Sequence, residues 1–250
     1  MKKLLTVLFV LLSLMIFGNT NSTALELVTL QYPPYEYLQN GEVKGVAVDI
    51  VREVFKRIKR PITITLYSWD QSLAMIQKGE ADAIFTIFKT PEREAYADYS
   101  HEVLMTQVVS LFIKSDSNIV FDGDVSKLRN CTFGVVHKIS YGSIFDQAVK
   151  NGVIRNIETS ETGEENMKKL LQGHVDILVS NRYGALDIVK KMNNVDQVKE
   201  LKPAIQSVPS YIAFSKKRGL TSLRDEYDMI LRKIKDDGIY ERIISSYFGE

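Results

Sequence analysis

The hydrophobic pattern near the start of the chain predicts a strand, a helix and a second strand. Residues Glu26–Leu30 and Ile62–Leu66 are short, largely aliphatic or β-branched runs of the kind that form strands. Between them, after Asp49, apolar residues recur with helical spacing at Ile50, Val54, Phe55 and Ile58. Asn40-Gly41 is a turn signal before this helix, and Pro61 ends it. This alternation predicts a parallel sheet covered by helices.

A helix, a glycine and a strand follow one another at two places far apart in the chain. The first is Leu73–Ile84, which contains Gly79, and the second is Met167–Leu178, which contains Gly173. Glycine commonly ends a helix because it adopts the left-handed conformation without steric cost. The repetition suggests two lobes of similar α/β topology, although such joints also occur in other folds.

The first 24 residues have the three-part layout of a secretory signal peptide. Lys2 and Lys3 precede an almost wholly apolar run, Leu4–Gly18, and small side chains follow at Ser22 and Ala24. The run is short for a membrane-spanning helix, which needs about 20 residues. We therefore expect cleavage after Ala24, with an uncleaved membrane anchor as the alternative. Because no cysteine near this point could carry a lipid, we expect a soluble periplasmic protein.

Composition argues against several classes of function. The chain of 250 residues is 45% hydrophobic and 25% charged, and its formal net charge is +1. This is the balance of a folded globular protein, and a nucleic-acid-binding protein would usually carry a basic excess. We therefore expect no nucleic-acid partner. The single cysteine cannot form an internal disulfide, and the three histidines lack metal-ligand spacing, so neither a metal nor a cofactor is expected.

Short motifs follow one another along essentially the whole chain after residue 24. They are Tyr32-Pro33-Pro34-Tyr35, Gly45–Ile50, Trp69-Asp70, Gly79–Asp82, Thr90–Arg93, Tyr99-Ser100, Gly173–Asp176 and Asp237–Tyr240. Each motif is weakly diagnostic alone, but the ordered set is specific. The chain resembles the extracellular solute-binding proteins of family 3, the polar amino-acid-binding proteins of bacterial importers.

The resemblance implies an α/β fold of the Venus-flytrap type, with two lobes that are each a mainly parallel sheet flanked by helices. Two strands cross between the lobes, and hinge closure traps a ligand in the cleft. By this analogy lobe 1 comprises residues 25–107 and 210–250, and lobe 2 comprises residues 108–209. The two crossings are expected near Thr106–Ser110 and Ser207–Ile212.

Arg93 is the strongest single candidate for a ligand contact. Thr90-Pro91 is typical of a helix cap followed by proline at the first helical position, so Arg93 falls in the first turn. A guanidinium there can bind a carboxylate with two parallel hydrogen bonds, assisted by the positive end of the helix. The resemblance implies that Arg93 holds the α-carboxylate of the ligand. The alternative is a surface arginine paired with Glu92 or Glu94.

Four further residues match binding positions of the family: Tyr32, Trp69, Thr86 and Phe88. By the resemblance, Tyr32 and Trp69 sandwich the ligand side chain, although both could instead serve core packing. Thr86 and Phe88 lie near the carboxyl end of the predicted strand Ala83–Phe88, where α/β proteins bind ligands. Thr86 can donate a hydrogen bond, whereas Phe88 stands where the family often has a hydroxyl and offers only its backbone.

The second lobe contributes two candidates, Ser140 and Asn181. Ser140 matches a hydroxyl that helps to bind the carboxylate, while Lys138 stands where glycine is usual and points either to solvent or into the cleft. Asn181 replaces an aspartate that pairs with the ligand's ammonium group in the family. Because an amide brings no charge, either another carboxylate such as Glu36 substitutes, or the ligand is not a standard α-amino acid.

Together these residues predict a periplasmic substrate-binding protein with no catalytic residue. We expect it to capture an amino-acid-like carboxylate by hinge closure and to deliver it, as a monomer, to the membrane permease of an ABC importer. One alternative is a dehydratase-like enzyme on the same scaffold, which would need a positioned acid in the cleft. The other is a ligand-sensing receptor whose closed form docks on a membrane signalling protein.

Overall fold

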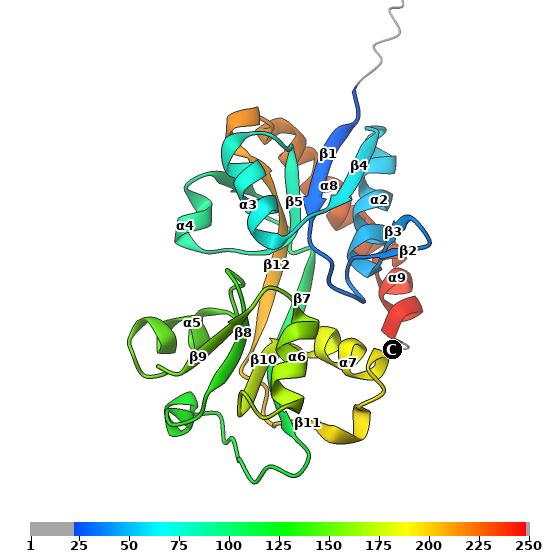
Figure 1. The fold of residues 1–250 in the computed structure, drawn as a ribbon. Coiled ribbons are helices and arrows are strands. Elements are labelled where there is room, and N and C mark those ends of the chain that lie inside the picture. Colours follow the sequence, from blue (N-terminus) through cyan, green and yellow to red (C-terminus); the bar gives the residue numbers. More distant parts are fainter. Residues whose placement is uncertain (1–22, 249–250) are drawn as a thin grey trace, which may run out of the picture.

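The computed structural model describes residues 23–248, which form two α/β lobes joined by two long strands (Figure 1). The expected signal peptide, residues 1–24, lies almost entirely outside the described residues. Within the described part of the chain, no helix is both long and apolar enough to cross a membrane. The expected cleavage and the periplasmic location of the chain therefore stay predictions.

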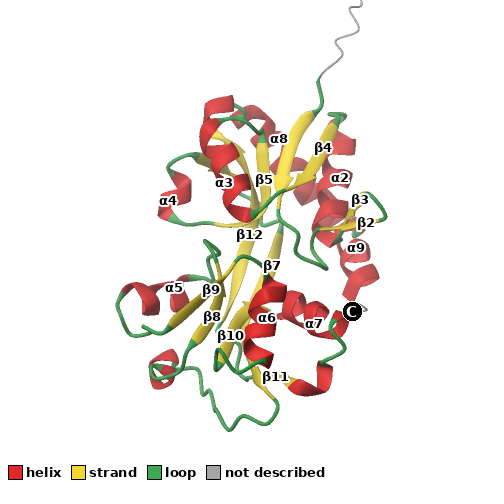
Figure 2. Ribbon diagram, viewed as in Figure 1, coloured by secondary structure: helices red, strands yellow, loops and turns green. Residues whose placement is uncertain are grey.

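The helices and strands alternate along the chain, and in each lobe the helices lie on both faces of the sheet (Figure 2). The strands are β1 (Leu25–Thr29), β2 (Tyr37–Gln39), β3 (Glu42–Lys44), β4 (Ile62–Leu66), β5 (Ala83–Phe88), β6 (Ala97–Tyr99), β7 (Met105–Lys114), β8 (Phe133–Val136), β9 (Ile157–Ser160), β10 (Ile177–Asn181), β11 (Val198–Glu200) and β12 (Gln206–Ser215). The helices are α2 (Val46–Ile58), α3 (Trp69–Lys78), α4 (Pro91–Glu94), α5 (Ser143–Lys150), α6 (Gly163–Leu171), α7 (Arg182–Lys191), α8 (Thr221–Asp236) and α9 (Ile239–Phe248), with short 3-10 helices η1 (Val125–Leu128), η2 (Val195–Gln197) and η3 (Lys216–Arg218).

Lobe 1 is built on the parallel strands β4, β1 and β5, extended by the antiparallel β12 and β6. Successive side chains of a strand face opposite sides of the sheet, and β1 shows this directly. Leu27 packs in the cluster that contains α2 and α8, whereas Val28 packs in the cluster that contains Trp69 and Ile76 of α3. Both faces of the sheet are therefore covered by helices, as the alternating pattern predicted.

Lobe 2 repeats this arrangement with the parallel strands β9, β8 and β10 and the antiparallel β7 and β11. Phe133 and Val179 pack on one face with Phe145 of α5. Leu178 packs on the other face with Met167 of α6 and with α7. Each lobe thus has its own hydrophobic core, which allows the two lobes to behave as separate bodies.

Two ten-residue strands, β7 and β12, carry the chain between the lobes. They pair antiparallel from Met105 opposite Ser210 to Val109 opposite Gln206. Beyond this segment β12 continues along β5 in lobe 1, and β7 continues along β10 in lobe 2. Within the described residues, one ten-stranded sheet therefore runs through both lobes.

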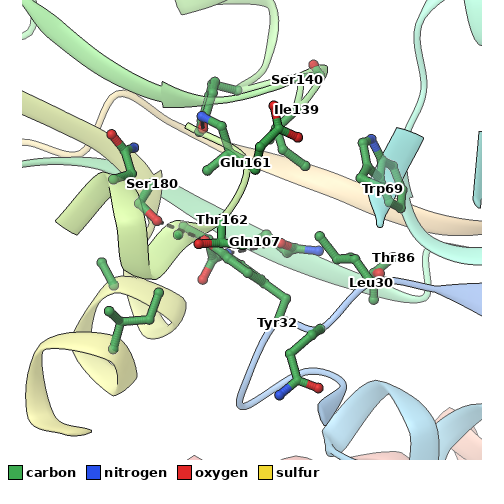
Figure 3. A pocket seen from close by; sticks show the side chains of 18 of the residues that line it. Leu30, Tyr32, Trp69, Thr86, Gln107, Ile139, Ser140, Glu161, Thr162 and Ser180 are labelled. Atoms are coloured by element: carbon green, nitrogen blue, oxygen red, sulfur yellow. Dashed lines mark hydrogen bonds between the residues drawn. The ribbon is translucent and has the colours of Figure 1, made fainter. Parts of the chain in front are cut away.

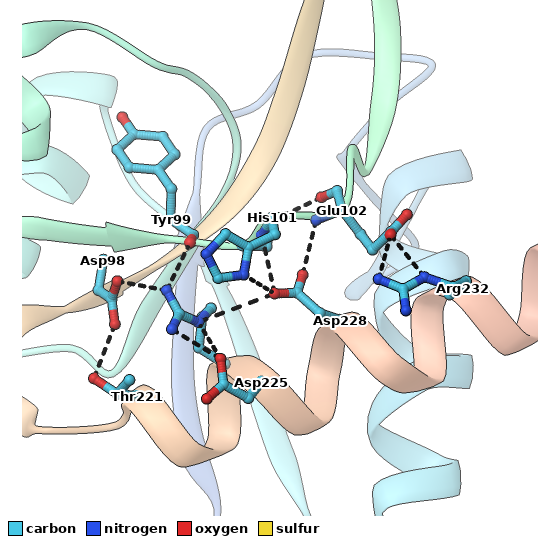
Figure 4. Close-up of polar contacts among 10 residues, drawn as sticks. Asp98, Tyr99, His101, Glu102, Thr221, Asp225, Asp228 and Arg232 are labelled. Atoms are coloured by element: carbon cyan, nitrogen blue, oxygen red, sulfur yellow. Dashed lines mark hydrogen bonds and ion pairs between the residues drawn. The ribbon is translucent and has the colours of Figure 1, made fainter.

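A polar cluster within lobe 1 fixes helix α8 to the segment that precedes β7 (Figure 4). The carboxylate of Asp228 accepts hydrogen bonds from the backbone N–H groups of His101 and Glu102, both at 2.9 Å. The carboxylate of Glu102 is in turn paired with Arg232 of α8 at 2.8 Å. Because Asp228 is buried, these charge-assisted bonds stabilise the corner from which the crossing strand leaves lobe 1.

The two-lobed α/β fold predicted from the sequence is confirmed. The Asn40-Gly41 signal forms the turn between β2 and β3, and the strand predicted over Ala83–Phe88 is β5. The two helix–glycine–strand segments are α3 followed by β5 and α6 followed by β10. The lobe boundaries at 107/108 and 209/210 stay a prediction, because β7 and β12 pass through them without a break.

Gly45 shows why one glycine in the matching motifs is required by the fold. Its φ is 131°, a conformation that is strained for any residue with a Cβ. A Cβ atom at this position would lie 2.1 Å from the carbonyl oxygen of Tyr35. The same carbonyl accepts a hydrogen bond from Ala47 in the first turn of α2. Gly45 thus allows the turn before β2 to pack directly on the start of α2.

We expect Gly45→Ala to lower the free energy of unfolding by at least about 3 kcal/mol, because strain and a backbone clash add together. Gly41→Ala is the matched control, since Gly41 also has a positive φ but no atom within 4 Å of the place where a Cβ would lie. It should cost about 1 kcal/mol. Urea unfolding of both variants measures the difference, and equal losses would contradict the close-packing explanation.

Candidate ligand-binding site

A cavity of about 240 Å³ lies between the two lobes, beside the crossing strand β7 (Figure 3). Drug-sized ligands occupy pockets of about 300 Å³ or more, so this cavity suits a smaller molecule such as an amino acid. All the site residues predicted from the sequence line it: Tyr32, Trp69, Thr86, Phe88, Arg93, Ser140 and Asn181. The fold brings these residues together, which supports the prediction that they share one site. That each of them contacts a ligand stays a prediction.

Arg93 is a buried cation in the wall of this cavity. Thr90 caps the N–H of Arg93 and Pro91 is the first residue of α4, as the sequence predicted. Arg93 is 7% exposed, and burial lowers the pKa of its guanidinium. Nη1 donates to the carbonyl oxygen of Phe88 at 3.1 Å, and Nη2 donates to that of Lys138 in lobe 2 at 3.0 Å. The alternative of a surface arginine paired with Glu92 or Glu94 is therefore wrong.

Trp69 forms the wall next to Arg93. It is the first residue of α3, whose N-cap Ser68 orients the start of the helix. The guanidinium carbon of Arg93 lies 5.5 Å from the centre of the Trp69 ring, within the range of a cation–π interaction. The buried Nε1 of Trp69 has no hydrogen-bond partner within the described residues. The indole ring thus borders the cavity and also supports the cation.

Tyr32 spans the two lobes. Its hydroxyl lies 2.8 Å from the Oγ of Ser180 in β10, and its ring stacks on Tyr35 at 6.2 Å between centroids. A Cβ on Gly184 would come within 2.6 Å of the Tyr32 ring, so a glycine in α7 makes room for this side chain. Burial raises the pKa of Tyr32 from its ordinary value of 10.0 to about 12. Tyr32 therefore packs against Tyr35 and α7 and also lines the cavity.

Thr86 holds an unusual backbone conformation at the end of β5. Its φ is 60°, in the left-handed region that a β-branched residue rarely adopts, and the pairing of β5 with β12 shifts register beside it. Such strain is often found at functional sites. The hydroxyl of Thr86 lies within hydrogen-bonding distance of the Phe85 carbonyl oxygen, at 2.6 Å, and of Oε1 of Glu36, at 2.8 Å.

Ser140 and Lys138 lie in the loop between β8 and α5. The hydroxyl of Ser140 donates to the carboxylate of Asp146, which also accepts the N–H of Tyr141 at 2.9 Å. Lys138 has a φ of 57°, which explains why glycine is a common choice there. Its ammonium pairs with Asp70 of lobe 1 and does not line the cavity, so it adds no second cation to the cavity wall.

Asn181 ends β10 and caps helix α7. Its Oδ1 accepts from the N–H of Gly184 at 3.2 Å, and its Nδ2 donates to Oε1 of Gln107 in β7 at 3.0 Å. The side chain is 4% exposed. Sequence reasoning found its position but missed its capping role and its partner. Asn181 thus holds together the cavity wall, the start of α7 and the crossing strand.

Three lining residues carry buried polar side chains that sequence reasoning missed or left open. Gln107 projects from the crossing strand, and Asn166 projects from α6 with its Oδ1 unpartnered within the described residues. Glu36, named only as a possible substitute carboxylate, is 1% exposed and also lines the cavity. Together with Arg93, these residues add separate hydrogen-bond donors and acceptors to a small cavity whose lining is otherwise largely aromatic and aliphatic. Such a cavity suits the binding of a compact polar molecule.

Two α/β lobes, two crossing strands and a cavity between the lobes are the features expected of a solute-binding protein. The family model for bacterial extracellular solute-binding proteins, family 3, matches residues 27–250, and the chain belongs to this family. Among its relatives is the L-cystine-binding protein TcyA of Bacillus subtilis, which is 22% identical over 222 residues, 88% of this chain and 78% of TcyA.

Two solved structures show the same fold. A histidine kinase sensor domain with similarity to periplasmic binding proteins superimposes with a TM-score of 0.81 at 18% identity, over 91% of this chain and 96% of that domain. The arginine-, lysine-, histidine-binding protein ArtJ of Geobacillus stearothermophilus gives a TM-score of 0.77 at 24% identity, over 91% of this chain and 96% of ArtJ. At these identities the likeness establishes the fold.

We expect Asn181→Ala to lower the free energy of unfolding by about 1 to 3 kcal/mol, because it removes a helix cap and the partner of a buried amide. Asn181→Asp keeps a capping oxygen, and Gln107 can turn its amide to donate to the new carboxylate. It should therefore be closer to the parent in denaturant unfolding. Equal stability of Asn181→Ala and the parent would contradict the capping role.

Proposed function

We propose that this solute-binding protein works in the periplasm, where it encloses a small amino-acid-like carboxylate between its lobes and delivers it to the permease of an ABC importer. The observation that carries the proposal is the buried guanidinium of Arg93 in the cavity wall, hydrogen-bonded to a carbonyl of each lobe. A buried cation attracts a carboxylate strongly because little water screens the pair.

The relatives support the ligand class. TcyA is named as an L-cystine-binding protein, YxeM of Bacillus subtilis as a probable amino-acid-binding protein, and ArtJ as a protein that binds arginine, lysine and histidine. All three names concern amino acids. The cavity of this chain has the size for one such molecule, and its aromatic residues Tyr32 and Trp69 supply faces for a side chain.

Contacts between the lobes support a closure mechanism. Tyr32 meets Ser180, Arg93 meets the carbonyl of Lys138, and the Lys138 ammonium meets Asp70, each pair joining the two lobes. These contacts surround or border the cavity. A ligand that touches both walls would add to them and favour the closed arrangement, which is how differential affinity shifts a conformational equilibrium.

An enzymatic role is the weaker alternative. The family to which the chain belongs is a family of solute-binding proteins, and the names of its relatives TcyA and YxeM describe binding. We therefore assign no catalytic residue. Turnover of a cyclohexadienyl acid by the purified protein would contradict this assignment.

The first test is a thermal-shift screen of the chain from Leu25 against amino acids, polyamines and organic acids. A ligand that binds only the folded state raises the melting temperature, by an amount equivalent to about 2.7 kcal/mol at a hundred times its dissociation constant. We expect at least one α-amino acid to do so, while compounds without a carboxylate do not. A screen in which no carboxylate causes a shift would contradict the proposed function.

The second test removes the buried cation. Arg93→Met keeps much of the side-chain volume but should weaken binding of a carboxylate by about a hundredfold or more, because two charge-assisted hydrogen bonds are lost. Arg129→Met is the matched control, since Arg129 is exposed and lies outside the cavity lining. Isothermal titration calorimetry measures both affinities, with circular dichroism to verify folding. Unchanged affinity of Arg93→Met would remove Arg93 from the site.

A further inference from the structure

Glu36 is a buried carboxyl group in the cavity that makes little use of its hydrogen-bonding capacity. It follows the turn at Tyr32–Tyr35, and its carbonyl oxygen accepts the N–H of Tyr32 at 2.7 Å, which fixes its backbone. Its side chain is 1% exposed and lines the cavity. Oε1 lies 2.8 Å from the Thr86 hydroxyl, whereas Oε2 has no hydrogen-bond partner within the described residues.

The groups that face Glu36 carry no positive charge. They are Thr29 of β1 and Thr86 of β5, together with Tyr32 and Tyr35 of its own turn. The charged side chains that share the cavity lining are Arg93 and Glu161, and neither forms an ion pair with Glu36 within residues 23–248.

An ionised Glu36 would therefore be a buried charge without a counterion, which is strongly unfavourable. Burial accordingly raises its pKa well above the ordinary value of 4.5. The hydrogen bonds agree with a neutral carboxyl group. The Thr86 hydroxyl has one hydrogen but two acceptors within reach, Phe85 O and Glu36 Oε1, and a proton on Glu36 would supply the second hydrogen bond.

We propose that Glu36 is the receptor for a cationic group of the ligand, and that binding of this group makes Glu36 release a proton. This inference rests on the proposed function, because it assigns a second charge-recognising residue to the same cavity. The O–H bond of the Glu36 carboxyl breaks and its proton passes to bulk water. The N–H groups of a ligand ammonium or guanidinium then donate to Oε2, while Thr86 donates to Oε1.

The assignment also accounts for the uncharged Asn181. Its amide is held by Gly184 and Gln107, and it carries no charge that could pair with a ligand ammonium. Glu36 and Arg93 instead place one carboxyl group and one guanidinium cation in the same cavity. This pair matches the opposite charges of an amino acid without requiring a charge at position 181.

The ligand-free protein tests the protonation of Glu36. Because its pKa is raised on folding, the stabilising effect of the neutral form is present below the unfolded pKa of about 4.5 and is lost as pH rises toward the folded value. Glu36→Gln keeps the shape and remains neutral. Its melting temperature should match that of the parent near about pH 4.5 and exceed it by about 3 °C or more near about pH 8. A constant difference across this range would overturn the proposal.

Binding tests the proton release, with L-arginine, L-lysine, L-histidine and L-glutamine as probes. Calorimetry at about pH 6 in two buffers of different ionisation enthalpy should show release of up to about one proton per bound probe. Affinity of the parent should rise about tenfold per pH unit below the pKa of Glu36. Glu36→Gln should lose both effects and, near about pH 8, bind about tenfold to a hundredfold more weakly.

Glu226→Gln is the control for the same chemical change, since Glu226 is exposed on α8 and outside the cavity lining. It should retain the proton release and the slope of affinity with pH. A probe that binds without proton release, or release that persists in Glu36→Gln, overturns the proposal while the proposed function stands. If none of the four probes binds but another carboxylate does, the proposal for Glu36 is likewise overturned while the proposed function stands. If no carboxylate binds at all, the proposed function itself fails.

Discussion

The antiparallel pairing of β7 with β12 is the constraint on which the rest of the molecule depends. Between Met105 and Val109 on one strand and Gln206 and Ser210 on the other, this ladder is the backbone connection of the two lobes. Each strand then joins the sheet of one lobe, β12 beside β5 and β7 beside β10. The carboxyl end of β5 and that of β10 are thereby brought to face the same cavity, where parallel strands commonly present binding residues.

Outside that ladder, the lobes meet through polar side chains and through a few apolar contacts, such as that of Tyr183 in α7 with Phe248 in α9, whose ring centroids lie 4.4 Å apart. Tyr32, Arg93 and Lys138 provide three of the polar contacts. Each lobe keeps its own hydrophobic core on both faces of its sheet. Because each core is held together within its own lobe, the lobes can move as two bodies when the contacts between them break, and this is the physical requirement for a hinge motion.

Much of the fold could be predicted from the sequence because its signals are local. The Thr90-Pro91 cap, the Asn40-Gly41 turn and the spacing of apolar residues in α2 depend on neighbours within a few positions. The motif order then indicated which residues would share a cavity, and all seven line it.

Other features of the site were not predictable because they depend on residues far apart in the chain. Asn181 caps α7 locally, but its second partner, Gln107, is 74 positions away on the crossing strand. Glu36 lies in a polar, tyrosine-rich turn that gives no sign of burial, and only the folding of β5 against that turn encloses it. The ion pair of Lys138 with Asp70 likewise joins residues that are 68 positions apart, one in each lobe.

The position of Trp69 has a practical consequence. It is the single tryptophan of the chain, and its indole ring lies in the cavity wall beside the Arg93 guanidinium. Indole fluorescence is sensitive to nearby charge and to exposure, so the emission of the whole protein originates largely from the one place where a solute would enter. The chain thus carries an intrinsic optical reporter of its own occupancy, and no external dye is needed to follow it.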